Sequence, residues 1–308
     1  MLTTRRAAHA ALVFAVCAAG CARDEWPSPP PVDDAKYRQE YAEFKKSQQE
    51  TAQYALPIVG TWRLPDGDTP FGSDPDLPIV LPAKASLARA GTFRRTGDGV
   101  TVIPAPNAQL RREDGTTVTS AARVDEGPPL VMGSVHFDVY GAPPDVFVSG
   151  RDESDPALED LHVETYPLDP KWRVAARFDA FETPRPIRIA TTQGTFHDAT
   201  AIGQLVFRLN GQEHRLTVPE AEDGGNGSFF VMFKDETNGK TTFSGYRMLS
   251  APAVKNGEWT VLDFNLASNP PCAYSKFTLC PLPPKENRLA TKVEAGVKRH
   301  PTARGYSE

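Results

Sequence analysis

Hydrophobic and polar residues alternate most regularly between positions 204 and 218. The alternating hydrophobic residues are Leu205, Phe207 and Leu209, followed by Leu216 and Val218. A period of two predicts strands with one buried face. The Asn210-Gly211 pair between the two segments favours a two-residue type I′ turn. The pattern therefore predicts a β-hairpin.

Two further Asn-Gly pairs follow, at positions 238–239 and 256–257. The segments around them, such as SFFVMF and EWTVLDFNL, are rich in β-branched and aromatic residues. Three such turns in close succession predict an antiparallel meander, in either a barrel-like or a sandwich-like arrangement.

Upstream, short strand-like segments alternate with turns rich in proline, glycine and aspartate. We expect a β-sandwich-like module over residues 57–150, an antiparallel β module with a C-terminal disulfide loop over 151–299, and a tail over 300–308. The 29 prolines and 23 glycines among 308 residues agree with this mainly β fold class, because both residues favour turns over long helices. The sequence leaves open whether the two modules are separate domains or one continuous β-fold.

One segment has the helical period instead. Over residues 34–53, Tyr37, Tyr41 and Phe44 fall at the i, i+4 and i+7 positions of an otherwise charged stretch. This spacing predicts an amphipathic helix with one apolar stripe, and Asp33 or Asp34 can cap its N-terminus. We expect this helix to dock against the body of the protein rather than to bind a partner.

The first twenty residues have the pattern of an export signal. Arg5 and Arg6 precede a short apolar run, which ends in small residues directly before Cys21. This pattern resembles a bacterial lipobox, so we expect residues 1–20 to be removed and Cys21 to be acylated. Residues 21–33 would then be the lipid anchor and a proline-rich tether. A plain secreted protein is the alternative.

This interpretation makes membrane lipid the expected partner and the bacterial cell envelope the expected location, with the body facing the periplasm. Ala22 stands where an aspartate would favour retention in the inner membrane, so the outer membrane is preferred. The formal net charge of −5 disfavours nucleic acid as a partner, since a mildly acidic surface repels phosphate.

Common catalytic and cofactor motifs are absent from the sequence. We find no G-x-S-x-G, P-loop, G-x-G-x-x-G or H-E-x-x-H pattern. The acidic turn at residues 65–78 offers oxygen ligands, but its spacing does not match an EF-hand loop. The sequence therefore predicts no cofactor and no metal site.

Two cysteines, Cys272 and Cys280, remain in the predicted folded part. In an oxidising periplasm, two remaining cysteines usually pair, so we expect a structural disulfide here. Free thiols and a metal site are the alternatives, although the familiar C-x₂-C pairs of zinc sites are missing.

The C-terminal motifs resemble the bacterial and archaeal family called domain of unknown function 1684. The resemblance rests on Asp263-Phe264-Asn265, the stretch NPPCAY from Asn269 to Tyr274, and Glu286-Asn287-Arg288. Upstream, the F-x-D-x-T-x-G pattern from Phe233 to Gly239 and the G-x-R pattern ending at Arg247 extend it. The resemblance covers roughly residues 36–298. Many members are lipoproteins and none has an assigned activity, so it supports the localisation and brings no catalytic residues.

Polar residues of these motifs form the candidate ligand site. They are Asp235, Arg247, Asp263, Asn265, Asn269, Tyr274, Glu286, Asn287 and Arg288. Two functions follow from them. The first is a membrane-anchored lipoprotein that acts as a non-enzymatic binding module for a small molecule or envelope component, or as a scaffold. The alternative is a hydrolase in which Asp263 and Glu286 serve as acid and base and Arg288 binds an anionic group. The same side chains can also simply satisfy backbone groups of irregular loops.

Overall fold

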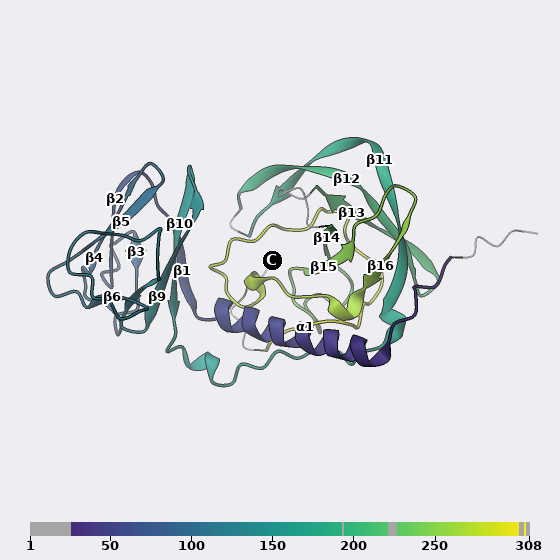
Figure 1. Cartoon of the computed structure of the whole chain (residues 1–308), viewed down its shortest axis with the longest axis horizontal. Helices are drawn as coiled ribbons and strands as arrows, with labels where there is room; N and C mark the ends of the chain where they lie inside the picture. The colour runs from purple at the N-terminus through teal and green to yellow at the C-terminus, as the bar shows by residue number, and fades with distance from the viewer. Residues whose placement is uncertain (1–25, 193, 221–226, 302–304, 306–308) are drawn as a thin grey trace, which may run out of the picture.

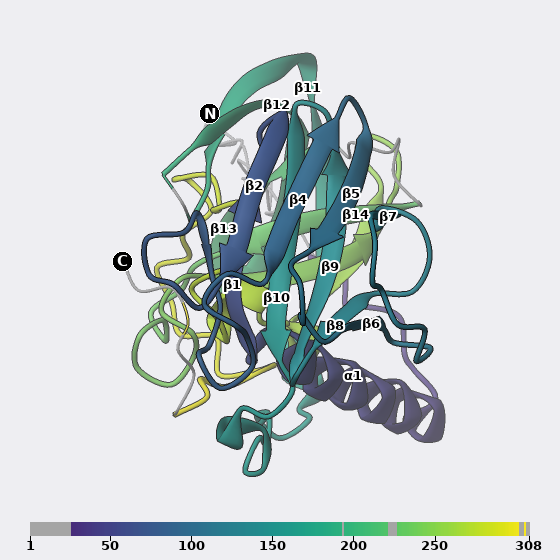
Figure 2. The same cartoon turned by 90° about the vertical axis from the view of Figure 1, so that its left-hand side faces the viewer.

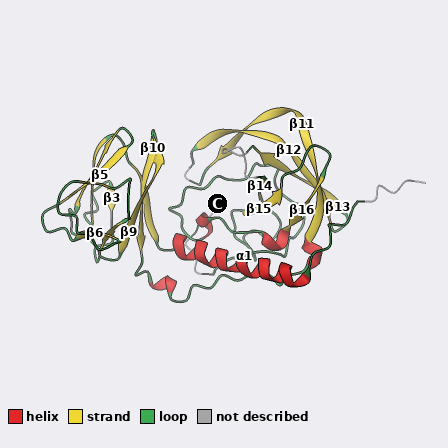
Figure 3. Cartoon of the chain, in the orientation of Figure 1, coloured by secondary structure: helices red, strands yellow, loops and turns green. Residues whose placement is uncertain are grey.

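The protein has two β-rich lobes that lie side by side, with one long helix beneath the second lobe (Figure 1). This computed structural model describes residues 26–192, 194–220, 227–301 and 305. Strands dominate both lobes (Figure 3), which confirms the predicted mainly β fold class. The predicted signal peptide and Cys21 lie outside the described residues.

The regular elements, in chain order, are α1 (Asp34–Ala55), β1 (Ile58–Arg63), β2 (Gly67–Gly72), β3 (Ile79–Val80), β4 (Gly91–Thr96), β5 (Gly99–Pro104), β6 (Leu110–Arg112), β7 (Ala122–Arg123), β8 (Leu130–Met132), β9 (Val135–Ala142), β10 (Asp145–Asp152), β11 (Arg173–Ala190), β12 (Phe196–Leu209), β13 (Gln212–Pro219), β14 (Ser228–Phe233), β15 (Arg247–Pro252) and β16 (Trp259–Asp263). The described residues also form four short 3₁₀ helices: η1 (Pro156–Leu158), η2 (Pro170–Trp172), η3 (Phe264–Leu266) and η4 (Pro271–Ala273).

The first lobe is a sandwich of two five-stranded sheets (Figure 2). Their strand orders are β1-β10-β9-β8-β6 and β3-β2-β4-β5-β7. All strand pairs are antiparallel except β2 with β3, which is parallel. The inward-facing residues of both sheets form one apolar core, with the rings of Phe71, Phe93 and Phe137 in mutual contact. The alternating burial along β4 and β9 explains why these segments form strands of a sandwich.

A buried carboxylate, that of Asp152, lies at the last residue of β10 in this lobe. The Asp152 carboxylate accepts hydrogen bonds from the Ser154 hydroxyl at 2.7 Å and the Ser154 amide at 3.1 Å, and its other oxygen pairs with Lys84 at 3.2 Å. Burial by itself would raise the pKa of Asp152. Hydrogen bonds from Ser134, Ser154 and Lys84 outweigh that effect and lower the pKa to about 2.

This carboxylate predicts an acid-sensitive component of stability. Because the pKa of Asp152 is lower in the folded state, its contribution is present above the ordinary carboxyl pKa, near 3.8, and is lost as the pH falls toward about 2. The contribution is on the order of 2 kcal/mol. Urea unfolding at neutral pH and at about pH 2.5 should show it as a steeper loss in wild type than in Asp152→Asn. Equal pH dependence in the two proteins would contradict this assignment.

The second lobe contains the hairpin that the sequence predicts. Strands β12 and β13 pair in register from Gly203 to Leu209, and Asn210 and Gly211 connect them with φ of 51° and 79°. Positive φ at both positions is the requirement of a type I′ turn. The hairpin belongs to the sheet β13-β12-β11-β16, whose inner face covers an apolar core that also includes β14 and β15.

The other two Asn-Gly pairs do not form two-residue hairpins. Strand β14 pairs with β15, but their last pair is Phe233 with Arg247, so Asn238 and Gly239 lie within the thirteen-residue connection. After Asn256 and Gly257, strand β16 pairs with β11 rather than with β15. The predicted antiparallel β-fold is confirmed, but the second Asn-Gly pair lies in a longer connection and the third is followed by a strand that pairs elsewhere. Side-chain hydrogen bonds within the 234–246 loop replace the ladder that a tight turn would have formed.

Helix α1 docks against the second lobe through polar as well as apolar contacts. The Asp33 carboxylate accepts from the Lys36 amide and caps the helix. Tyr37 and Tyr41 are buried, and the Tyr41 hydroxyl donates to the carbonyl of Tyr166. Gln48 accepts from the amide of Asn269, which ties the helix to the C-terminal loop. In the described part of the chain, no helix is long and apolar enough to cross a membrane.

Candidate functional site

The loop from Asp235 to Thr242 is fixed by its own side chains. The Asp235 carboxylate accepts from the Thr237 amide at 2.7 Å, and Asn238 accepts from the Asp235 amide at 2.7 Å. Gly239 has φ of 76°, a conformation that residues with a Cβ rarely adopt. The F-x-D-x-T-x-G pattern thus describes a self-capped loop, which holds the exposed Lys240 at its tip.

Beneath this loop lies a fully buried ion pair. Arg247 donates to the other oxygen of Asp235 at 2.5 Å, and neither side chain is exposed to solvent. The guanidinium also donates to the carbonyls of Val293 and Ala295. Burial lowers the pKa of Arg247, while the Asp235 carboxylate acts in the opposite direction. This pair fastens the loop to the C-terminal segment, and it leaves Asp235 and Arg247 little freedom to contact a ligand.

Asp263 and Asn265 hold helix α1 in place. The Tyr37 hydroxyl donates to Asp263 at 2.6 Å, and the other oxygen of Asp263 accepts from the amide and side chain of Asn265. Burial and the Asp263 carboxylate raise the pKa of Tyr37, so the phenol stays protonated as a donor. The Asn265 side chain also accepts from the amide of Asp169 and donates to its carbonyl. The polar atoms of this cluster are thus bonded within the fold, to helix α1 and to the backbone of Asp169.

The remaining candidates fall into two groups. Asn269, Tyr274 and Asn287 are buried. Asn287 links three segments, because it accepts from the Thr217 amide and donates to the carbonyls of Thr217 and Met232. Glu286 and Arg288, in contrast, are exposed. Among the described residues, no hydrogen bond or ion pair joins Asp263, Glu286 and Arg288, the three residues of the hydrolase alternative.

Cys272 and Cys280 are both free thiols in this structure, and no disulfide joins them. Both are buried in an apolar cluster that includes Tyr246 and Tyr274. The neighbouring Cys280 thiol, together with burial, raises the pKa of Cys272. Because the two cysteines are not joined here, the disulfide expected from the sequence stays a prediction. Alkylation of the purified protein before and after reduction measures whether the pair is oxidised.

Two cavities flank the tip of the Asp235–Thr242 loop. The first has a volume of about 520 Å³. Its lining includes the cationic residues Lys234, Lys240 and Arg288, together with Asp235 and Glu236. Lys234 and Arg288 come together because the chain pairs their backbones in a short parallel bridge, with the Lys234 amide donating to the Asn287 carbonyl at 2.8 Å.

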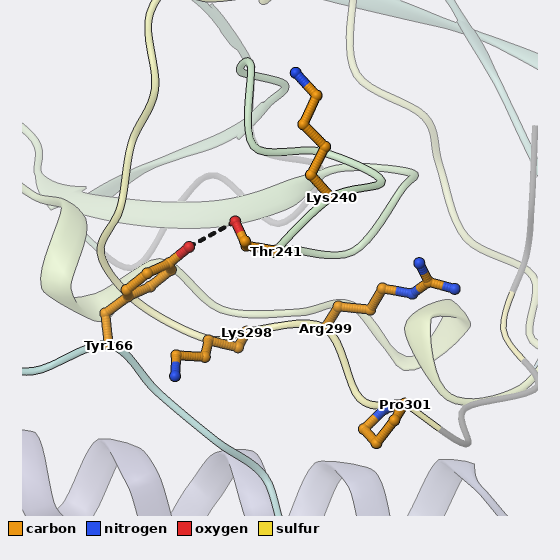
Figure 4. Close-up of a pocket in the computed structure, with 6 residues that line it drawn as sticks. All are labelled: Tyr166, Lys240, Thr241, Lys298, Arg299 and Pro301. Carbon is orange, nitrogen blue, oxygen red and sulfur yellow. Dashed lines mark hydrogen bonds between the residues drawn. The ribbon is translucent and has the colours of Figure 1, made fainter.

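The second cavity shares Lys240 with the first and has a volume of about 540 Å³. It is lined by Tyr166, Lys240, Thr241, Lys298, Arg299 and Pro301 (Figure 4). The hydroxyls of Tyr166 and Thr241 are hydrogen-bonded at 2.6 Å. The Arg299 amide donates to the Thr241 carbonyl at 2.9 Å, which brings the C-terminal segment alongside the loop. We call the two cavities together the Lys240 site.

The Lys240 site is cationic although the chain as a whole has a formal net charge of −5. Five of its lining residues are basic and two are acidic. Arg247 compensates Asp235, and Glu164 pairs with Lys298 at 3.2 Å. Among the described residues, no carboxylate forms an ion pair with Lys240, Arg288 or Arg299. A concentration of positive charge in a concave site attracts anions.

Only part of this site is predicted by the sequence. Of the candidate residues, Asp235 and Arg288 line the cavities. Lys240, Tyr166, Lys298 and Arg299 are not among the candidates. The position of Lys240 directly after the loop glycine was the one available signal. The approach of Lys298 and Arg299 depends on tertiary contacts and leaves no local pattern.

Most residues of the Lys240 site lie within a segment that matches one protein family. The family model described as "Protein of unknown function (DUF1684)" matches residues 161–298, which is shorter than the expected 36–298. No curated protein matches the chain. The solution NMR structure of an uncharacterized protein from Haloarcula marismortui is similar at 32% sequence identity, over 47% of this chain and 80% of that chain, with a TM-score of 0.39. The matched segment includes the Asp235–Thr242 loop, Arg247 and Lys298.

Proposed function

This chain belongs, through residues 161–298, to the family of proteins of unknown function DUF1684, and on that premise we propose that it is a membrane-anchored envelope lipoprotein that binds a small anion at the Lys240 site. The proposal is for a non-enzymatic binding module. The observation that carries it is the clustering of Lys240, Arg288 and Arg299 around two cavities without carboxylate partners among the described residues.

The chemistry of the lining favours an oxyanion with more than one negative charge. Lysine offers a point charge with three donors, and arginine offers a planar fork that matches carboxylate and phosphate groups. Lys240 lines both cavities, so it can contact an anion in either one. The Tyr166 and Thr241 hydroxyls add donors at the wall of the second cavity. Phosphate groups and polycarboxylates share the features that this lining recognises.

The self-capped loop supports binding because it presents Lys240 in a fixed place. The buried Asp235–Arg247 pair below it and the Arg299–Thr241 backbone contact beside it leave the loop few alternative conformations. A preorganised site loses less conformational entropy when a ligand binds. The loop is therefore a rigid support for a cation and not a flexible lid.

Isothermal titration of the soluble Cys21→Ser protein with inorganic phosphate and with citrate tests this proposal. We expect saturable binding of both anions that weakens as salt is added, because salt screens exposed charges. Acetate, with a single charge, should bind more weakly than either. The absence of saturable binding for phosphate and citrate at low salt would overturn the proposal.

The anchoring part of the proposal rests on the sequence before residue 26. The lipobox-like residues before Cys21 support acylation of this cysteine, and two or three acyl chains make a stable anchor. We propose the outer membrane as its location, with the two lobes in the periplasm. That compartment is oxidising, which favours pairing of Cys272 with Cys280.

Replacement of the proposed lipid-bearing cysteine should release the protein. In cells grown with labelled palmitate, wild type should incorporate the label and sediment with membranes, whereas Cys21→Ser should be unlabelled. Cys17→Ser is the matched control, because Cys17 lies in the segment that we expect to be removed. Persistent labelling of Cys21→Ser would rule out acylation at this position.

A further inference from the structure

The described chain starts on the outer face of the sheet β13-β12-β11-β16. Trp26 donates from its indole nitrogen to the carbonyl of Ala175 in β11 at 3.2 Å. Its ring contacts Trp259 of β16 edge to face, with a centroid distance of 4.9 Å. The guanidinium of Arg208 in β12 lies 4.7 Å from the Trp26 ring centroid. The proline-rich segment is therefore attached to the body from Trp26 onward, and it is not a free tether over its whole length.

This attachment fixes how far the body can be from the lipid anchor. Trp26 follows Cys21 by five positions, and an extended chain spans at most about 3.3–3.6 Å per position. The reach is therefore at most about 18 Å. This distance limit rests on the proposed acylation of Cys21. If that cysteine is acylated, the surface around Trp26 must lie close to the bilayer.

The surface around Trp26 has the composition of a membrane-interface region. Trp259 is 39% exposed. Strand register places Trp259 beside Arg177, and the Arg177 guanidinium lies 5.9 Å from the Trp259 ring. Tryptophan is enriched at the headgroup level of membranes because its ring is apolar and its N–H is polar. Arginine pairs with phosphate through its planar fork. We call Trp26, Arg177, Arg208 and Trp259 the Trp26 patch.

We infer that the Trp26 patch is the membrane-facing surface of the protein and contacts the phospholipid headgroups. Asp179 already pairs with Arg177 at 2.6 Å, whereas no described carboxylate forms an ion pair with Arg208. Arg208 is thus the cation available for a lipid phosphate. The purple segment that precedes α1 lies on the side of the second lobe opposite the β1–β10 sandwich (Figure 1). The sandwich lobe therefore points away from the bilayer.

Tryptophan fluorescence tests this orientation, because the four tryptophans of the chain occupy different places. They are Trp26 and Trp259 in the patch, Trp62 in the sandwich lobe and the buried Trp172. The acylated full-length protein is reconstituted into vesicles that contain phosphatidylcholine brominated close to the headgroup. We expect quenching relative to unbrominated vesicles. Most of the quenching should disappear in Trp26→Phe/Trp259→Phe and persist in Trp62→Phe.

Vesicle flotation separates the failure of this inference from the failure of the anchor. A protein that does not float has lost its anchor, which overturns the proposed acylation and the orientation that rests on it. A protein that floats without quenching at Trp26 and Trp259 overturns the orientation alone. A second copy of the chain is the other possible occupant of the patch. A dimer of Cys21→Ser in sedimentation that Arg208→Glu dissociates would also overturn the inference.

Discussion

Replacement of Arg247 by methionine should destabilise the protein by about 3–5 kcal/mol, the usual result of removing one partner from a buried ion pair. The change leaves the Asp235 carboxylate buried without its cation, although Asp235 and Arg247 are both fully shielded from solvent. It also removes the donors to the carbonyls of Val293 and Ala295. Urea unfolding followed by circular dichroism measures the difference as a lower midpoint.

Arg94 offers a matched control for this prediction. Arg94 pairs with Asp68 through two bonds, at 2.6 and 2.8 Å, but both side chains are about half exposed. An exposed pair of this kind typically contributes about 0–1 kcal/mol. Arg94→Met should therefore change the unfolding midpoint far less than Arg247→Met. If the two variants lose the same stability, Arg247 does not fasten the loop to the C-terminal segment as we describe.

Charge reversal at Lys240 should weaken anion binding by at least about tenfold, whereas stability should change little. Two unit charges about 4 Å apart interact by roughly 1 kcal/mol in water and roughly 4 kcal/mol near a protein surface, and about 1.4 kcal/mol corresponds to tenfold in affinity. Lys240 is exposed and forms no ion pair with a described carboxylate. Titration of Lys240→Glu with inorganic phosphate measures the effect.

Lys46→Glu provides the control for Lys240→Glu. The Lys46 side chain is 79% exposed on helix α1, and its reversal changes the net charge of the protein by the same amount. We expect phosphate affinity close to wild type in Lys46→Glu. Equal weakening in the two variants would show that phosphate responds only to the overall charge, and the Lys240 site would lose its support.

The features that sequence analysis predicted correctly are encoded by neighbouring residues. The hairpin around Asn210 and Gly211 follows from short-range alternation and from a turn that both residues favour. Helix α1 follows from its apolar stripe and from the cap at Asp33. In both elements, the tertiary contacts agree with the local preference. The period and the capping residue were therefore sufficient.

The features that sequence analysis missed depend on contacts between distant segments. Asn238 and Gly239 favour a tight turn locally, but Asp235 directs its carboxylate to Thr237 and Arg247, which builds a longer loop. Motif residues such as Arg247 and Asn265 resembled a ligand site because they are polar. In the structure, their hydrogen bonds are internal. Conversely, Lys240 and Arg299 are far apart in sequence and share a cavity only after folding.

Amide chemical shifts during a phosphate titration test the Lys240 site most directly. In ¹H–¹⁵N spectra of the soluble Cys21→Ser protein, inorganic phosphate should shift the signals of Gly239, Lys240, Thr241 and Arg299 in a saturable way. The same signals should stay in place in Lys240→Glu at equal phosphate concentrations. Binding at the Lys240 site would be contradicted if phosphate left these four amides unmoved in the Cys21→Ser protein, or moved them equally in Lys240→Glu.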